Sequence, residues 1–155
     1  MSSIQSTLQT LLETEMSAGG LLANLNGVYI GGIKLMAAES YPVLIIDSTP
    51  GKYIFNGNHL LVIVNLTLTV HVIMSVVSDA EEVRDKLIYD YSTTPASGLI
   101  AFFLKYGGLT VGSLRYKISL GEIETGVGTD KGGRETAAAE IPLELSTRMA
   151  VTPHV

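Results

Sequence analysis

The longest regular pattern in the chain is an alternation of apolar and polar side chains between Leu60 and Val76. Every even-numbered position of this segment is apolar, and four odd positions in its middle are polar: Asn65, Thr67, Thr69 and His71. A period of two is typical of a β-strand with one face on a core and the other open to water. Fully extended, residues 59–77 would span roughly 60 Å at about 3.3 Å per residue. Because this exceeds the width of a small domain, the strand must bend, bulge or project past its own subunit.

Three shorter segments also have the pattern of β-strands. YPVLIID, residues 41–47, is apolar and begins beside a proline, where a missing N–H does least harm. Residues 114–120 and 137–146 alternate again. Pro142 predicts that the second of these lies at a sheet edge, because proline cannot donate to a ladder. Two turn signals, STPGK at 48–52 and NGN at 56–58, precede the long strand.

Three further segments predict helices. Residues 1–16 and 78–91 each begin with a capping box, Ser2 with Gln5 and Ser78 with Glu81. Their apolar residues recur at helical spacing: Ile4, Leu8, Leu11 and Leu12 in the first, and Ala80, Val83, Leu87 and Tyr91 in the second. ASGLIAFFLKYGG, residues 96–108, is apolar nearly all round, which favours a buried helix and leaves a strand as the alternative.

These elements predict a single domain over residues 1–155 with an α+β fold, because strands and helices occur in separate runs. We expect an antiparallel β-sheet with helices packed on one face, one long β-strand or hairpin, and a C-terminal β-hairpin. The N-terminal helix (1–16) is followed by an irregular glycine-rich segment (17–40) with a short helix near Leu21–Leu25. The remaining parts are the α+β core (41–150) and a loose tail (151–155).

Composition adds an expectation about assembly. Apolar residues make up 46% of the chain, charged residues 16%, and the mean hydropathy is +0.36. A small domain has much surface for its volume, so surplus apolar residues often lie in a subunit interface, and we expect a homo-oligomer. A net charge of −5 argues against tight nucleic-acid binding, which needs clustered cations.

No membrane segment is expected. Residues 59–77 are long enough to span a bilayer as a helix, but their central polar residues and many β-branched side chains favour a strand. Residues 1–16 lack the charged and apolar regions of a secretory signal. With no cysteine, the chain has neither disulfides nor thiolate metal sites.

The segment GEIETGVGTDKGGRE, residues 121–135, has the glycine content of a phosphate-binding loop but not its order. A P-loop needs Gly-Lys-Ser/Thr before a helix, whereas here Lys131 precedes the glycine pair and a strand follows. We therefore interpret residues 121–135 as a flexible hairpin connection, which neighbouring subunits would order.

The remaining searches for chemistry also point away from an enzyme. His59 and His71 would be roughly 40 Å apart on one strand, and His154 lies in the tail, so they do not predict a metal site. The sequence has no nucleophile elbow such as G-x-S-x-G. The pairs Glu122–Glu124 and Glu140–Glu144 have the spacing of residues on one strand face, which is typical of the solvent-exposed face of a hairpin. We expect no catalytic, cofactor-binding or metal-binding residues. The sequence leaves one alternative open, a catalytic triad formed by residues that are distant along the chain.

Two groups of residues are candidates for contacts with partners. In the glycine-rich connection they are Gly126, Gly128, Asp130, Lys131, Gly132, Gly133 and Arg134. Three further cations, Arg115, Lys117 and Arg148, would form a polar contact face with Arg134 on the solvent side of the last two strands. They either balance nearby carboxylates or contact an acidic partner surface.

Several of these segments together resemble one family. YPVLIID, a turn, the long alternating strand, SDAEEVRDKL and LGEIETGVGTDKGGRETAAAEIPLELSTR are similar to the tail terminator (tail completion) proteins of tailed bacteriophages. In that family an acidic helix follows the long strand, and a final strand ends in an arginine after a loop rich in glycine and charge. The resemblance covers residues 1–149 by its pattern of elements more than by invariant residues, and the glycine-rich segment 17–40 departs from it.

The resemblance implies a structural virion protein of the tail or neck, made in the host cytoplasm. Family members form a six-fold ring that caps the head-proximal end of the tail tube, stops its polymerisation and presents a docking surface to the neck. The implied partners are other copies of the chain, the tail tube protein and a neck or connector protein. DNA passes through the ring without being bound tightly, and the loop at 126–133 would contact a partner or the lumen.

Two alternatives to a tail terminator remain. One is another neck or head–tail connector protein, or a tail tube subunit, since these share related sheets. The other is a small-ligand-binding α+β domain whose apolar segment 96–109 lines a pocket.

Overall fold

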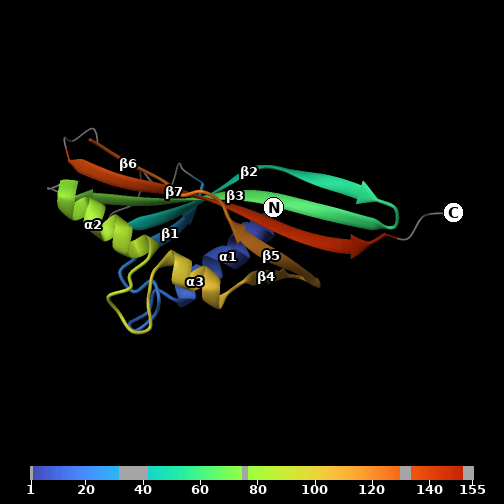
Figure 1. The fold of residues 1–155 in the computed structure, drawn as a ribbon, viewed down its shortest axis with the longest axis horizontal. Helices are drawn as coiled ribbons and strands as arrows, with labels where there is room; N and C mark the ends of the chain where they lie inside the picture. The colour runs from blue at the N-terminus through green and yellow to red at the C-terminus, as the bar shows by residue number, and fades with distance from the viewer. Residues whose placement is uncertain (1, 32–41, 75–76, 130–133, 152–155) are drawn as a thin grey trace.

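The chain is elongated and has an α+β fold, as the sequence predicts (Figure 1). The computed structural model describes residues 2–31, 42–74, 77–129 and 134–151. The helices among them are α1 (Ser2–Thr14), α2 (Val77–Ile88) and α3 (Leu99–Lys105). The strands are β1 (Gly27–Ile30), β2 (Val43–Asn56), β3 (His59–Met74), β4 (Gly108–Val111), β5 (Leu114–Leu120), β6 (Glu124–Thr129) and β7 (Glu135–Ala150).

The predicted long strand is β3, which lies near the middle of one seven-stranded sheet. The strand order is β1-β2-β3-β7-β5-β4, and β6 pairs with β7 beside β5. β3 pairs with β7 from His59↔Ala150 to Met74↔Glu135. Because paired residues share a face, the even positions of β3 and the odd positions of β7 lie on one face, and most of these residues are apolar.

The helices cover part of this apolar face. Leu66, Leu68, Val70 and Val72 of β3 are buried in one cluster with side chains from all three helices, including Leu8, Ala80 and Phe102. The predicted helix in 96–108 is present as the shorter α3, and Leu104 within it is exposed. α2 ends at Ile88, so Tyr91 does not belong to its apolar stripe and is 82% exposed, contrary to expectation.

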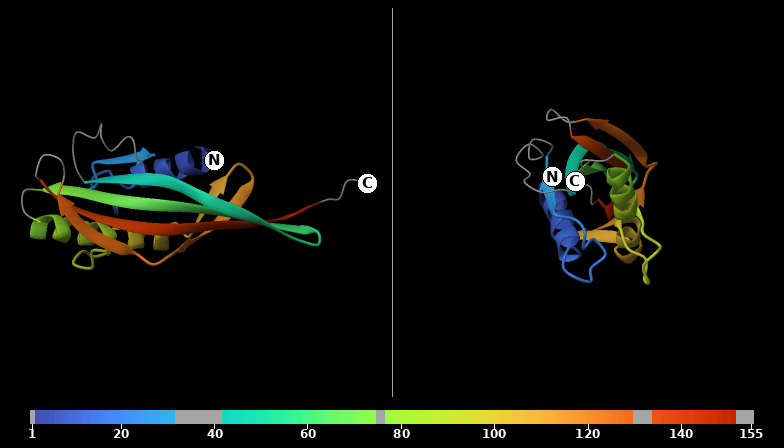
Figure 2. Two further views of the ribbon diagram at one scale, coloured as in Figure 1. Left: turned by 90° about the horizontal axis from the view of Figure 1, so that it is seen from above. Right: turned by 90° about the vertical axis from the view of Figure 1, so that its left-hand side faces the viewer.

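Beyond the helices, β2, β3 and β7 continue together as a three-stranded arm (Figures 1 and 2). We define the arm as residues 50–63 and 147–151. Its tip is the predicted turn at NGN: Asn56 pairs with His59, and Gly57 has a φ of 63°. The described residues contain no non-glycine residue with positive φ. These angles match a type II′ turn, which needs glycine at its first central position.

The expected turn at STPGK is instead a β-bulge inside β2. The register shifts between Thr49↔Asn65 and Lys52↔Ile63, so Pro50 and Gly51 together lie opposite one residue of β3. β1 pairs with β2 only at residues 43–46, so Pro50 lies where β2 has no outer strand among the described residues. The side-chain amide of Asn65 donates to the Pro50 carbonyl over 2.9 Å and ties the bulge to β3.

The prediction that Pro142 marks an edge strand is wrong, because β7 has partners on both sides. β5 pairs with residues 143–146 of β7 and β6 with residues 135–140, which leaves a break opposite Pro142. The Gly121 N–H donates to the Pro142 carbonyl over 2.8 Å, so the carbonyl points toward this break. In a β-strand the N–H and the carbonyl of one residue point to the same side. The N–H that Pro142 lacks would therefore face the break, where no strand needs it.

Two further expectations need correction. The sheet is mixed and not wholly antiparallel, since β1 runs parallel to β2, with Gly27 opposite Val43. The segment 17–40 is not irregular throughout, because it contains β1, and residues 21–24 form turns in place of a short helix. Residues 32–40 lie outside the described residues. β1 was not predicted from its local sequence, because a strand of four residues depends on its partner strand, here residues 43–46 of β2.

The close approach at the bulge gives a stability prediction. A Cβ on Gly51 would lie 2.2 Å from the Ile63 carbonyl oxygen, whereas a Cβ on exposed Gly126 would meet nothing within 4 Å. We expect Gly51→Ala to lower the free energy of unfolding by about 1–3 kcal/mol, because the backbone must shift. Urea denaturation would measure it, with Gly126→Ala as the matched control. Equal stability of the two variants would contradict this account of the bulge.

Candidate functional site

The arm exposes large apolar side chains at its outer end. Tyr53 is 70% exposed, Phe55 65% and Ile54 42%. Tyr53 lies opposite Val62 and Phe55 opposite Leu60, so both are on the face that the helices cover further along the sheet. Ile54 is on the other face. We call Tyr53, Ile54 and Phe55 the arm tip patch.

Sequence reasoning missed this patch. The two turn signals at 48–52 and 56–58 leave residues 53–55 looking like a short link and not like part of a strand. The available signal was the run Tyr-Ile-Phe itself, since three large apolar residues are unusual in an exposed connection.

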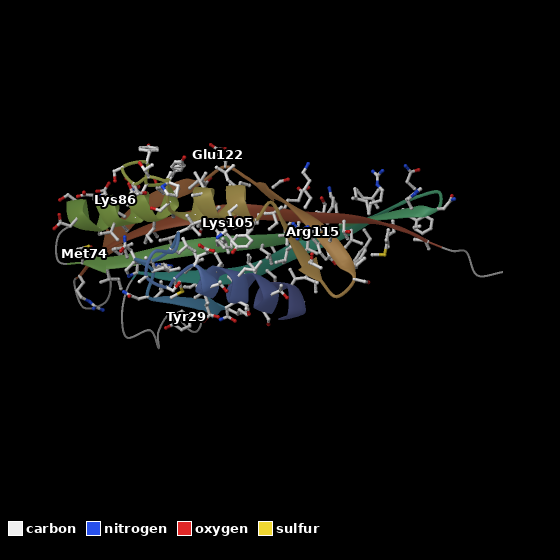
Figure 3. All side chains as sticks on the ribbon, turned by 90° about the horizontal axis from the view of Figure 1, so that it is seen from below. Tyr29, Met74, Lys86, Lys105, Arg115 and Glu122 are labelled. Carbon is white, nitrogen blue, oxygen red and sulfur yellow. The ribbon has the colours of Figure 1, made fainter. Side chains whose placement is uncertain are left out.

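Of the expected polar contact face, Arg115, Lys117 and Arg148 lie on the arm side of the molecule, and all three are exposed. Lys117 is opposite Ser146, two residues from Arg148, and both cations are on the face away from the helices. Arg115 Nη1 donates to Thr110 Oγ1 over 3.1 Å within the β4–β5 pair (Figure 3). Lys52, which was not among the expected contact residues, lies in the same row across the sheet. It pairs with Ile63, Ile63 pairs with Ser146, and Ser146 pairs with Lys117.

Arg134 does not join this group. It precedes Glu135, which pairs with Met74 at the far end of β3, whereas Arg148 pairs with Leu61 near the arm. Fourteen residues of strand separate the two arginines, which corresponds to roughly 45 Å. Arg134 is exposed at the other end of the molecule.

The glycine-rich connection is shorter than expected. Glu124–Thr129 form β6, paired with β7 from Glu124↔Glu140 to Thr129↔Glu135. Of the candidate contact residues, Gly126 and Gly128 are exposed in this strand. Four others, Asp130, Lys131, Gly132 and Gly133, lie outside the described residues. The alternation of glycine with Thr125, Val127 and Thr129 was the overlooked strand signal.

Arg84 of α2 holds β6 in place. Its side chain is 7% exposed, and its Nη1 donates to the Gly126 carbonyl over 3.1 Å. Its Nε pairs with Asp85 at 3.0 Å, and its Nη2 lies 3.8 Å from Glu81. A buried guanidinium needs such partners, because desolvating an unpaired charge is costly. The contact satisfies a carbonyl of an edge strand and joins that strand to the helix.

A groove lies along α2 and the segment after it. A shallow, open cavity of about 600 Å³ is lined by aromatic and charged side chains: Glu81, Glu82, Asp85, Lys86, Tyr89, Asp90 and Tyr91. A neighbouring cavity of about 530 Å³ adds Ile88 and Ile100. The rings of Tyr89 and Tyr91 are 5.0 Å apart. We call these nine residues the α2 groove.

Local hydrogen bonds shape this groove. Asp90 accepts from the backbone N–H and the hydroxyl of Ser92, and these bonds lower the pKa of Asp90 from its ordinary value of 3.8. Lys86 pairs with Glu82 at 3.2 Å. The segment 96–108 contributes Ser97 and Gly98 to a separate cavity of about 310 Å³.

The outward face of the sheet places two carboxylates directly opposite each other. Glu124 pairs with Glu140, and like charges in this position repel. His71 lies nearby, and burial lowers its pKa from 6.5, while the charge of Glu140 opposes this shift. Within the described residues, no group of three or more His, Cys, Asp or Glu side chains is arranged to hold a metal ion.

Glu15 fixes the junction between α1 and α3. Its carboxylate accepts hydrogen bonds from Lys105 Nζ and Tyr106 Oη, both at 2.8 Å, and from the Leu21 N–H at 3.2 Å. The hydrogen bond from Lys105 lowers the pKa of Glu15 below its ordinary value of 4.5, and burial partly opposes this. The cluster is structural, since it joins three segments beneath the sheet.

No family model and no curated protein matches this chain. No helix in the described part of the chain is long and apolar enough to cross a membrane.

The Glu15 cluster gives a pH-dependent prediction. Because its folded pKa lies below 4.5, the interaction contributes stability above that pH and loses it as the pH falls through the folded pKa. We expect Glu15→Gln to lower the free energy of unfolding by about 1–3 kcal/mol at pH 7. The difference from the unmodified chain should shrink at about pH 3.

Urea denaturation at both pH values measures this effect. Glu13→Gln is the matched control, because Glu13 is an exposed carboxylate two residues before Glu15, at the end of α1. A pH-independent difference for Glu15→Gln would show that the charged hydrogen bonds are not its cause.

Proposed function

We propose that this chain is a structural subunit of a ring that terminates the tail tube of a tailed bacteriophage and joins it to the neck. The proposal starts from the resemblance of the strand and helix pattern to tail terminator proteins. The arm is the observation that supports it best, because its outer end has no covering layer within the described part of the subunit.

The physical argument rests on exposed apolar area and open strand edges. Tyr53 and Phe55 continue the face that is buried further along β3, so this face is suited to contact with another protein. Within the described residues, β2 has no outer strand partner beyond Ile46, and its edge can pair with another chain. Natural proteins rarely leave such an edge uncovered, which favours an assembled state.

The long hairpin and the C-terminal hairpin that the sequence predicts are part of this proposal. We assign β2 and β3 with the turn at 57–58 as the long hairpin of such a subunit, and β6 with β7 as its C-terminal hairpin. A net charge of −5 is compatible with a ring through which DNA passes without tight binding. The ring order proposed is six, as the resemblance implies.

A length assay on tail tubes tests the function. When the purified chain is added to polymerising tail tube subunits, we expect shorter tubes and a ring at one end in electron micrographs. Neck protein should then bind the capped end. A variant with a conservative change on the exposed face of α1, Thr10→Ser, serves as the control and should act like the unmodified chain.

The same assay separates the alternatives. A tube subunit would be incorporated and lengthen the tubes, and a neck protein would bind only ends that are already capped. An unchanged length distribution with bare ends would refute a terminator role.

A further inference from the structure

Two groups of large exposed apolar side chains lie far apart on the molecule. One is the arm tip patch. The other is the α2 groove and its surroundings, where Tyr91 is 82% and Leu104 76% exposed. The arm and α2 lie at opposite ends of the long axis (Figures 1 and 2), so one copy cannot cover its own patch.

The arm carries cations, whereas the α2 groove is predominantly acidic. Residues 48–63, 108–120 and 145–151 contain no Asp or Glu, but they carry Lys52, Arg115, Lys117 and Arg148. The α2 groove is lined by four carboxylates, Glu81, Glu82, Asp85 and Asp90, and by one cation, Lys86, which pairs with Glu82. The neighbouring Arg84 pairs with Asp85. Figure 3 shows Lys86 on α2 and Arg115 toward the arm.

We propose that the arm tip patch of one copy docks in the α2 groove of the next copy, head to tail. The two surfaces are complementary in apolar character, the cations of the arm complement the carboxylates of the groove at longer range, and both surfaces occur in every copy. A contact between two different surfaces of identical subunits repeats from one copy to the next, and it closes a ring when the rotation allows. This inference rests on the proposed function, because it supplies the contact between subunits of the ring.

The two sets of residues have different roles in this contact. Tyr53 and Phe55 provide apolar area for Ile88, Tyr91 and Ile100, and aromatic residues of this kind dominate interface energies. Lys52 and Arg148 lie on the opposite face of the arm from Tyr53 and Phe55, so they act at a distance, attracting the arm toward the carboxylates around the groove and steering the approach. Rim charges change association rates and salt dependence more than affinity, so assembly should slow as salt rises.

Cross-linking tests the contact directly, because the chain has no cysteine of its own. In a chain that carries Phe55→Cys and Tyr91→Cys, a short bismaleimide should join copies into a ladder of covalent multimers. The matched control carries Phe55→Cys with Thr10→Cys, since Thr10 is exposed on α1 and lies away from the groove. A ladder of equal yield in the control, or none in the test variant, overturns the contact.

A mixing experiment tests its direction. Variant one has Tyr53→Ser and Phe55→Ser and keeps its groove; variant two has Tyr91→Ser and Glu82→Lys and keeps its arm. Sedimentation velocity should find each variant monomeric, and a mixture should form dimers of one copy of each and nothing larger. Assemblies of unmodified size in either variant, or a mixture that stays monomeric, would exclude a head-to-tail contact here.

The outcomes for the inference and for the function are distinguishable. Rings of the unmodified chain without specific cross-linking overturn the contact and leave the tail function standing. Specific cross-linking with no effect on tube length overturns the tail function and leaves the contact. An unmodified chain that neither associates nor binds tube ends overturns both.

Discussion

The continuous pairing of β3 with β7 determines most of this molecule. The pairing extends from His59 to Met74 without a register shift, so every second residue of β3 is on one face throughout. Three helices cover that face along only part of its length, and the strands continue beyond them. A strand that is longer than the layer beneath it exposes apolar side chains at its free end.

The two ends of the molecule differ because different elements surround them. The arm consists of strands alone, and its charged side chains are cations. The other end is built around α2, whose solvent face carries Glu81, Glu82 and Asp85. Separating opposite charges along one axis disfavours side-by-side association of copies in the same orientation, and it favours contacts between unlike ends.

Much of this architecture could be predicted from local sequence. The alternation in β3, the stripe in α1 and the turn at Gly57 depend on neighbouring residues, and each was identified. The errors concern features that depend on distant partners. Pro142 is tolerated in a central strand because β5 and β6 leave a break opposite it, and β1 exists because β2 lies beside it. No local pattern contains that information.

The candidate contact residues divide in the same way. Arg115, Lys117 and Arg148 were found because alternation places them on a solvent face, whereas Tyr53 and Phe55 were missed because their exposure depends on where the helices end. The α2 groove was also missed, since it is formed by residues 78–92 together with Ile100 of α3.

The bulge at Pro50 and Gly51 decides which side chains the arm presents on each face. Before it, even-numbered residues of β2 such as Ile46 share the helix-covered face with the even residues of β3. After it, the odd-numbered Tyr53 and Phe55 take that face, opposite Val62 and Leu60. One inserted residue thus inverts the parity of the strand. Without the inserted residue, Tyr53 and Phe55 would lie on the cationic face of the arm and Lys52 on the apolar face. The number of residues between the core and the arm tip, and not only their identity, therefore determines which side chains each face presents.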